Sequence, residues 1–194
     1  MAIPLRQVER EARACRFCAP QLLVEPRPVF RVGRGARLLV VGQAPGRRVH
    51  ESGLPWNDPS GDVLRAWLGL DRTAFYDASR VAIVPMGLCY PGTVAGVDLP
   101  PCRACAPRWQ PRFRAALPGI RLTLLVGSYA QAYYLGARRK ASLAETVRAY
   151  RDYLPEHFVL PHPSWRNKRW LQNNPWFETQ VIPALRRRVK SCIG

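Results

Sequence analysis

Acidic residues are scarce in this sequence, and long apolar runs are missing from it. Thirteen Asp and Glu residues stand against 30 Lys and Arg, so the 194-residue chain has a formal net charge of +17. Such a balance is usual for proteins that meet a polyanion, and nucleic acid is therefore the first candidate partner. Because nearly all the basic residues are arginine, an arginine-rich surface without such a partner is the alternative.

No apolar run is long enough to span a membrane, and the first residues, 1–6, do not resemble a secretory signal. We therefore expect a cytoplasmic protein with no membrane partner. The length and the 47% hydrophobic content suit one domain, residues 1–194, with a real core. The sequence contains no internal repeat and no low-complexity tract.

Short apolar runs alternate with helical patterns along the chain. Strands are predicted at 38–41, 81–84, 122–126 and 158–160. Helices are predicted at 5–16, from Pro59 onward, and at 106–117, 128–136, 141–153 and 175–191. This alternation predicts the α/β class: a three-layer α/β/α sandwich with a central, mostly parallel four-stranded sheet.

Polar or Gly/Pro-rich loops follow three of the predicted strands, at 42–56, 85–101 and 161–167. Right-handed crossovers bring the carboxyl ends of such strands to one edge of the sheet, where open α/β sheets bind their ligands. One cleft is thus expected to hold Gln43, Trp56, Tyr90 and His162. Flanking prolines fix the position of His162, which suits a side chain that must be aimed.

Six cysteines are present, at 15, 18, 89, 102, 105 and 192. A cytosolic setting disfavours disulfides, so the pair Cys15 and Cys18 indicates metal or redox chemistry. Cys89 with Cys102 or Cys105 could supply a second pair. Four thiolates can hold zinc or an iron–sulfur cluster, and spacing alone does not separate these. Free buried cysteines are the remaining alternative.

Three motifs resemble those of a known family. The stretch Gly42-Gln43-Ala44-Pro45-Gly46, with Gly53-Leu54-Pro55-Trp56 and Pro59-Ser60-Gly61, resembles the first motif region of the uracil-DNA glycosylase superfamily. His162-Pro163-Ser164 resembles its second motif. The order and spacing of four cysteines resemble those of the iron–sulfur uracil-DNA glycosylases: Cys15, Cys18, Cys89 and Cys105. The resemblance covers about residues 12–190.

The resemblance implies specific roles for single residues. Gln43 would orient the attacking water, His162 would hydrogen-bond the oxygen of the departing pyrimidine, and Trp56 would stack on the extruded base. Val49 and His50 would screen the C5 position of the base. The four cysteines would hold a [4Fe–4S] cluster, with zinc as the alternative, and would fasten an N-terminal arm at residues 1–35.

The remaining expected contacts divide into two sets. The base would also meet Gly42, Ala44, Tyr90 and Ser164. DNA would be contacted by residues that flank the two motifs: Arg47, Arg48, Trp165, Arg166, Lys168 and Arg169.

Two departures from the family pattern affect the identity of the base. Pro85 stands where the iron–sulfur relatives carry a base-reading asparagine, and Gln43 is neutral. We expect a monomeric, monofunctional DNA glycosylase that excises uracil from single- or double-stranded DNA. The alternatives are excision of hypoxanthine or xanthine, and a catalytically inactive nucleic-acid binding protein.

Overall fold

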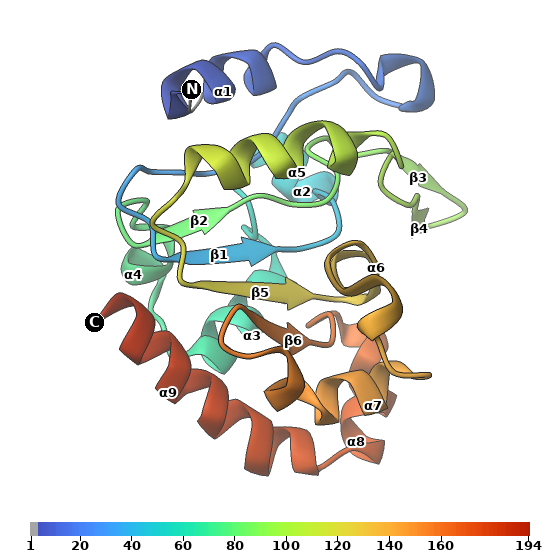
Figure 1. The fold of residues 1–194 in the computed structure, drawn as a ribbon. Coiled ribbons are helices and arrows are strands. Elements are labelled where there is room, and N and C mark those ends of the chain that lie inside the picture. The colour runs from blue at the N-terminus through green and yellow to red at the C-terminus, as the bar shows by residue number, and fades with distance from the viewer. Residues whose placement is uncertain (1–3) are drawn as a thin grey trace.

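The structure, a computed structural model that describes residues 4–194, is built on one parallel sheet (Figure 1). Its strands, in the order β2-β1-β5-β6, are β2 (Val81–Ile83), β1 (Leu38–Val41), β5 (Leu122–Val126) and β6 (His157–Leu160). Every neighbouring pair is parallel. The predicted sandwich is confirmed, and each strand lies within one residue of its predicted bounds.

Helices cover both faces of the sheet because its crossovers run in opposite directions. The connection from β1 to β2 contains α3 (Pro59–Leu68), whereas α5 (Cys105–Ala116) connects β2 back across β1 to β5. Right-handed crossovers in opposite directions place these helices on opposite faces. The last helix, α9 (Ile182–Ile193), packs beside α3, where the Arg186 guanidinium donates to the Ala66 carbonyl at 2.8 Å.

Several short elements complete the chain. The other helices are α1 (Leu5–Arg13), α2 (Arg47–Ser52), α4 (Arg72–Tyr76), α6 (Ser128–Leu135), α7 (Leu143–Arg148) and α8 (Lys168–Asn173). A small hairpin pairs β3 (Thr93–Val94) with β4 (Val97–Asp98). Sequence patterning did not predict α2, α4, α8 or the hairpin. None of the helices within residues 4–194 combines the length and the apolar composition that a bilayer crossing requires.

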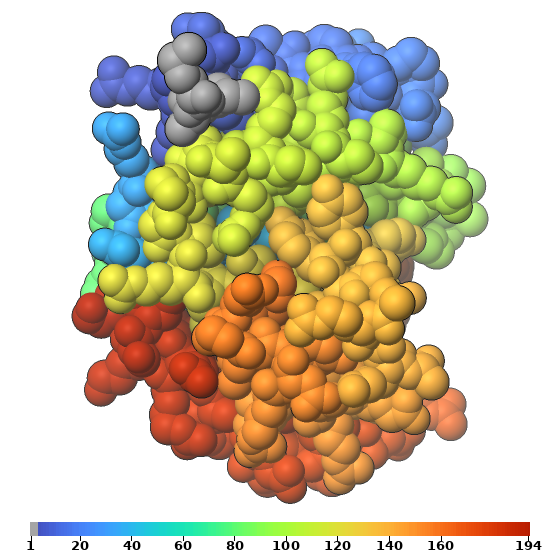
Figure 2. All heavy atoms as spheres, viewed as in Figure 1, coloured from blue at the N-terminus to red at the C-terminus, as the bar shows by residue number. Residues whose placement is uncertain are grey.

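The N-terminal arm lies along the outside of α5 and the segment that precedes it (Figure 2). Glu11 on α1 forms an ion pair with Arg112 on α5. Further on, the Val29 N–H donates to the Leu88 carbonyl at 2.7 Å, and Arg31 pairs with Ile83 through two backbone hydrogen bonds. Ordinary backbone hydrogen bonds therefore already fasten the described part of this arm to the domain.

The start of α3 fixes the position of Trp56. This residue has a left-handed backbone, φ 58°, which costs roughly 1 kcal/mol or more for a residue with a side chain. Two residues later, Asp58 caps the helix by accepting from the Gly61 N–H at 2.8 Å. A Cβ on Gly61 would lie 1.8 Å from the Trp56 carbonyl oxygen. Only glycine therefore fits at position 61.

We expect Gly61→Ala to lower the free energy of unfolding by roughly 1–3 kcal/mol, because the added methyl group overlaps the Trp56 carbonyl. Urea denaturation of the two proteins measures the change. Gly46→Ala is the matched control, since its φ of −84° suits any residue and its Cβ would meet Asp98 at an ordinary 3.5 Å. Equal stability of Gly61→Ala and the wild type would contradict this packing.

Candidate active site

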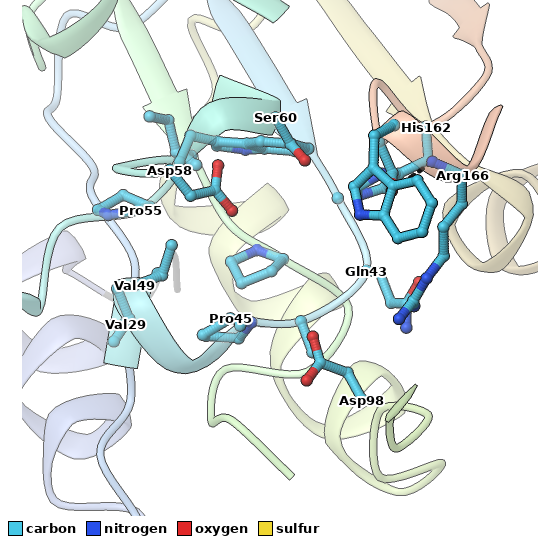
Figure 3. Close-up of a pocket in the computed structure, with 18 of the residues that line it drawn as sticks. Val29, Gln43, Pro45, Val49, Pro55, Asp58, Ser60, Asp98, His162 and Arg166 are labelled. Atoms are coloured by element: carbon cyan, nitrogen blue, oxygen red, sulfur yellow. Dashed lines mark hydrogen bonds between the residues drawn. The ribbon is translucent and has the colours of Figure 1, made fainter. Parts of the chain in front are cut away.

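A cavity of about 420 Å³ opens at the carboxyl edge of the sheet (Figure 3). Its lining comes mainly from the segments that follow β1, β2 and β6, as the chain order predicts. Nine of the predicted site residues line it: Gly42, Gln43, Ala44, Val49, Trp56, His162, Ser164, Trp165 and Arg166. Residues distant in sequence thus meet around one hollow that is large enough for a small organic group.

Two predicted base contacts, His50 and Tyr90, are not part of this lining. Their rings contact each other instead, with centroids 5.7 Å apart and planes inclined by 47°. Helix α2, which the sequence did not predict, explains why His50 does not line the cavity. On this helix Val49 is buried and lines the cavity, and His50 lies about 100° further around the helix axis. The structure therefore does not bring His50 and Tyr90 into the cavity wall, and their contact with the base stays a prediction.

His162 lies in the loop that follows β6 and is held through its backbone. The Asn167 side-chain amide donates to the His162 carbonyl at 2.7 Å. Burial lowers the pKa of the imidazole to about 4. At neutral pH the ring is therefore uncharged, and it can present one N–H donor to a group in the cavity.

Trp56 forms an aromatic wall beside the histidine. The two ring centroids are 5.5 Å apart, and the rings are inclined by 31°. The indole also covers Gly42, where a Cβ would lie 2.7 Å from the ring atom Cζ2. The glycine that ends β1 thus permits the close approach of this wall to the motif loop.

Two carboxylates that the sequence did not single out also line the cavity, Asp58 and Asp98. Burial raises the pKa of Asp58, and the Gly61 N–H and Arg65 oppose this rise. Asp98, on the β3–β4 hairpin, accepts from the Thr93 hydroxyl at 2.7 Å. The position of Asp58 before a Pro-Ser-Gly helix start was a visible signal for a cap, whereas nothing in the sequence marked Asp98.

The rim of the cavity is aromatic and basic. The Trp165 side chain is 81% exposed, and the neighbouring Arg166 donates to the Gly96 carbonyl at 3.3 Å. Four further predicted DNA contacts do not line the cavity and lie exposed on the surface: Arg47, Arg48, Lys168 and Arg169. Of the six predicted DNA contacts, Trp165 and Arg166 therefore belong to the cavity wall, and the other four are exposed basic residues outside it.

A second, smaller hollow contains five cysteines. All four predicted ligands line it, and so does Cys102: Cys15, Cys18, Cys89, Cys102 and Cys105. The Leu88 N–H points at the Cys105 sulfur at 3.3 Å. Burial raises the pKa of Cys89 to about 12 and that of Cys105 to about 11, which is unlike a reactive catalytic thiolate.

The donor set of this hollow suits a group larger than one ion. Within residues 4–194, no three Cys, His, Asp or Glu side chains converge closely enough to hold a single metal ion. A zinc ion binds each thiolate at about 2.3 Å and so requires tightly gathered sulfurs. Cysteines that line one common hollow from separate segments fit an iron–sulfur cluster, since its ligands bind separate iron atoms.

We expect the stability advantage of the wild type over His162→Gln to shrink as the pH falls from about 6.5 to about 4. The unfolded chain protonates this histidine near pH 6.5, whereas the folded protein does so only near pH 4. Unfolding therefore takes up a proton in this window, so the stability declines there by at most about 1.4 kcal/mol per pH unit.

Urea denaturation of both proteins at several pH values measures this difference. His157, whose pKa burial also lowers, is common to the two proteins and cancels. Parallel pH profiles would show that the His162 ring is not desolvated.

Comparison with known proteins identifies one family, whose profile covers most of the chain. The profile of the uracil DNA glycosylase superfamily matches residues 30–186. A solution NMR structure from Methanosarcina acetivorans, whose own assignment as a uracil DNA glycosylase is provisional, is also similar. It is 14% identical, with a TM-score of 0.48 over 83% of this chain and 98% of that one. On the strength of the profile match, the chain belongs to the uracil DNA glycosylase superfamily.

Proposed function

We propose that this protein is a monofunctional DNA glycosylase that flips a deaminated base, in the first place uracil, out of DNA and hydrolyses its N-glycosidic bond. The observation that carries the proposal is the meeting of Gln43, Trp56 and His162 around one cavity. A base inside a duplex is inaccessible to such a cavity, so the target must be extruded from the stack. Membership of the superfamily supports DNA as the partner.

His162 supplies the principal stabilisation of the leaving group in this scheme. As the bond from C1′ of the sugar to the base breaks, positive charge develops on the sugar and negative charge on the base. A neutral imidazole N–H aimed at the base oxygen binds more strongly as that negative charge grows. The lowered pKa of His162 keeps the ring in this neutral form.

Gln43 and Trp56 have complementary tasks. The amide oxygen of Gln43 accepts a hydrogen bond from water and so holds it for attack on C1′. Because the sugar cation is highly electrophilic, the water needs orientation more than full deprotonation, and a neutral side chain is sufficient. Trp56 stacks on one face of the flipped base and offsets part of its lost stacking.

Pro85 occupies the position where related enzymes carry the side chain that reads the base, and it has no polar side-chain atom. Pro85 lines the cavity, and a proline offers neither a backbone N–H nor a polar side-chain atom. This observation favours hypoxanthine or xanthine as second candidates beside uracil. A protein that keeps the fold and binds nucleic acid without catalysis is the third candidate.

We propose further that Cys15, Cys18, Cys89 and Cys105 hold a [4Fe–4S] cluster. The hollow that they line connects the N-terminal arm to the segment after β2 and the start of α5. The group would supply structural fastening there, in addition to the backbone hydrogen bonds of the arm, within a single domain that spans the chain.

His162→Ala should reduce single-turnover excision of uracil from an oligonucleotide by about 10²–10³-fold, the range for loss of one preorganised donor. DNA affinity should barely change, because the hydrogen bond strengthens mainly as charge develops. His157→Ala is the control, since it removes a histidine from the opposite end of β6. Full excision activity in both His162→Ala and Gln43→Ala would refute the assignment.

The purified protein should be yellow-brown and contain iron, as an iron–sulfur cluster requires. Cys15→Ser or Cys89→Ser should bleach it and lower its stability, measured by visible absorbance, metal analysis and thermal denaturation. Cys192→Ser should keep the colour, because this thiol lies on α9 and contacts the Arg37 carbonyl at 3.3 Å. A colourless protein with stoichiometric zinc would reject the cluster.

A further inference from the structure

Asp58 occupies an unusual place for a helix cap, because its side chain also lines the cavity (Figure 3). One carboxylate oxygen, Oδ1, accepts from the Gly61 N–H at 2.8 Å. Within residues 4–194, the other oxygen, Oδ2, has no hydrogen-bond partner. In Figure 3 the carboxylate points into the hollow, on the wall opposite His162.

Capping alone does not explain a carboxylate here. Serine and asparagine cap helices as well as aspartate does, and they carry no charge into a partly buried site. The neighbouring Arg65 acts on this charge only through space, since its guanidinium hydrogen-bonds to Asp62 at 2.5 Å and to the Trp56 carbonyl at 3.1 Å. A half-buried acceptor without a donor has a desolvation cost that a ligand donor would offset.

The other strong acceptors that line the cavity have partners or tasks of their own: Asp98 accepts from the Thr93 hydroxyl at 2.7 Å, and Gln43 is the residue proposed to hold the water. Opposite Asp58, His162 acts as a donor, and Val49, Pro55 and Pro85 supply apolar surface. Deamination turns the ring nitrogen N3 of cytosine, or N1 of adenine, from an acceptor into an N–H donor. An acceptor-only carboxylate is the group that detects this change, because it binds the N–H and repels the lone pair of the unmodified base.

We propose that Asp58, through Oδ2, accepts the ring N–H of the flipped base and is the residue that distinguishes uracil from cytosine and hypoxanthine from adenine. The ligand class is a base with a lactam or imide N–H, which includes uracil, hypoxanthine and xanthine. This inference rests on the proposed glycosylase function and deepens it, since it names the contact that replaces the polar group missing at Pro85.

The test compares two variants that both preserve the helix cap. Asp58→Ser removes the side chain that reaches the base, and single-turnover excision of the best substrate should fall about 10–100-fold, as for loss of a hydrogen bond to a charged group. Asp58→Asn can turn an N–H toward the base, so its preference for uracil over cytosine, and for hypoxanthine over adenine, should shrink. Thermal denaturation should show both variants folded.

Asp71→Ser is the matched control. Asp71 caps α4 in the same manner, accepting from the Ala74 N–H at 2.7 Å, and it does not line the cavity. Its replacement should leave both the rate and the base preference unchanged.

Binding of free bases separates this proposal from the glycosylase assignment. The wild type should bind uracil more tightly than N3-methyluracil, which lacks the N–H, whereas Asp58→Ser should bind the two equally. This preference without any excision would refute the proposed function but support the role of Asp58. Equal binding of the two bases by the wild type, or an equal rate loss on every base in Asp58→Ser, would overturn the role of Asp58.

Discussion

The site depends on how closely Trp56 approaches two glycines. A Cβ on Gly42 would lie 2.7 Å from the indole ring, and one on Gly61 would lie 1.8 Å from the Trp56 carbonyl oxygen. The first contact seats the aromatic wall on the end of β1, and the second joins it to the start of α3. Asp58 lies between Trp56 and Gly61, so the positions of the wall, the cap and the carboxylate are set by one short segment. The contacts of Trp56 with the two glycines hold its backbone in a left-handed conformation, which is strained for a residue with a side chain.

The sheet could be predicted because its strands are short, apolar and separated by helical patterns. Once four such strands are parallel, their carboxyl ends share an edge, and Gln43 and His162 must lie near each other. Helix α2 could not be predicted in the same way. Its six residues make less than two turns, too few for a periodic pattern to show, so residues 42–56 looked like one irregular loop. Both Val49 and His50 were expected at the base through the family resemblance, and of the two only Val49 lines the cavity.

The same limit applies to side-chain direction. The Pro59-Ser60-Gly61 helix start marks Asp58 as a helix cap, but the direction of its side chain into the cavity depends on the left-handed backbone of Trp56. Tryptophan gives no sequence signal for that conformation, as glycine would. The side-chain direction of Tyr90 could not be predicted either. Its hydroxyl bonds to Thr93 within the β3–β4 hairpin, a two-residue pairing that no alternation of residues announces.

Charge is distributed unevenly between the cavity and its rim. Although acidic residues are scarce in the chain, Asp58 and Asp98 both line the cavity, while arginines gather at its rim and beyond. Phosphates are attracted to such a rim, and carboxylates inside keep the backbone of a nucleic acid from following the base inward. A positively charged donor in the cavity would neutralise these carboxylates. His162, whose pKa is about 4, is uncharged at neutral pH and can donate a hydrogen bond to the departing base without adding positive charge.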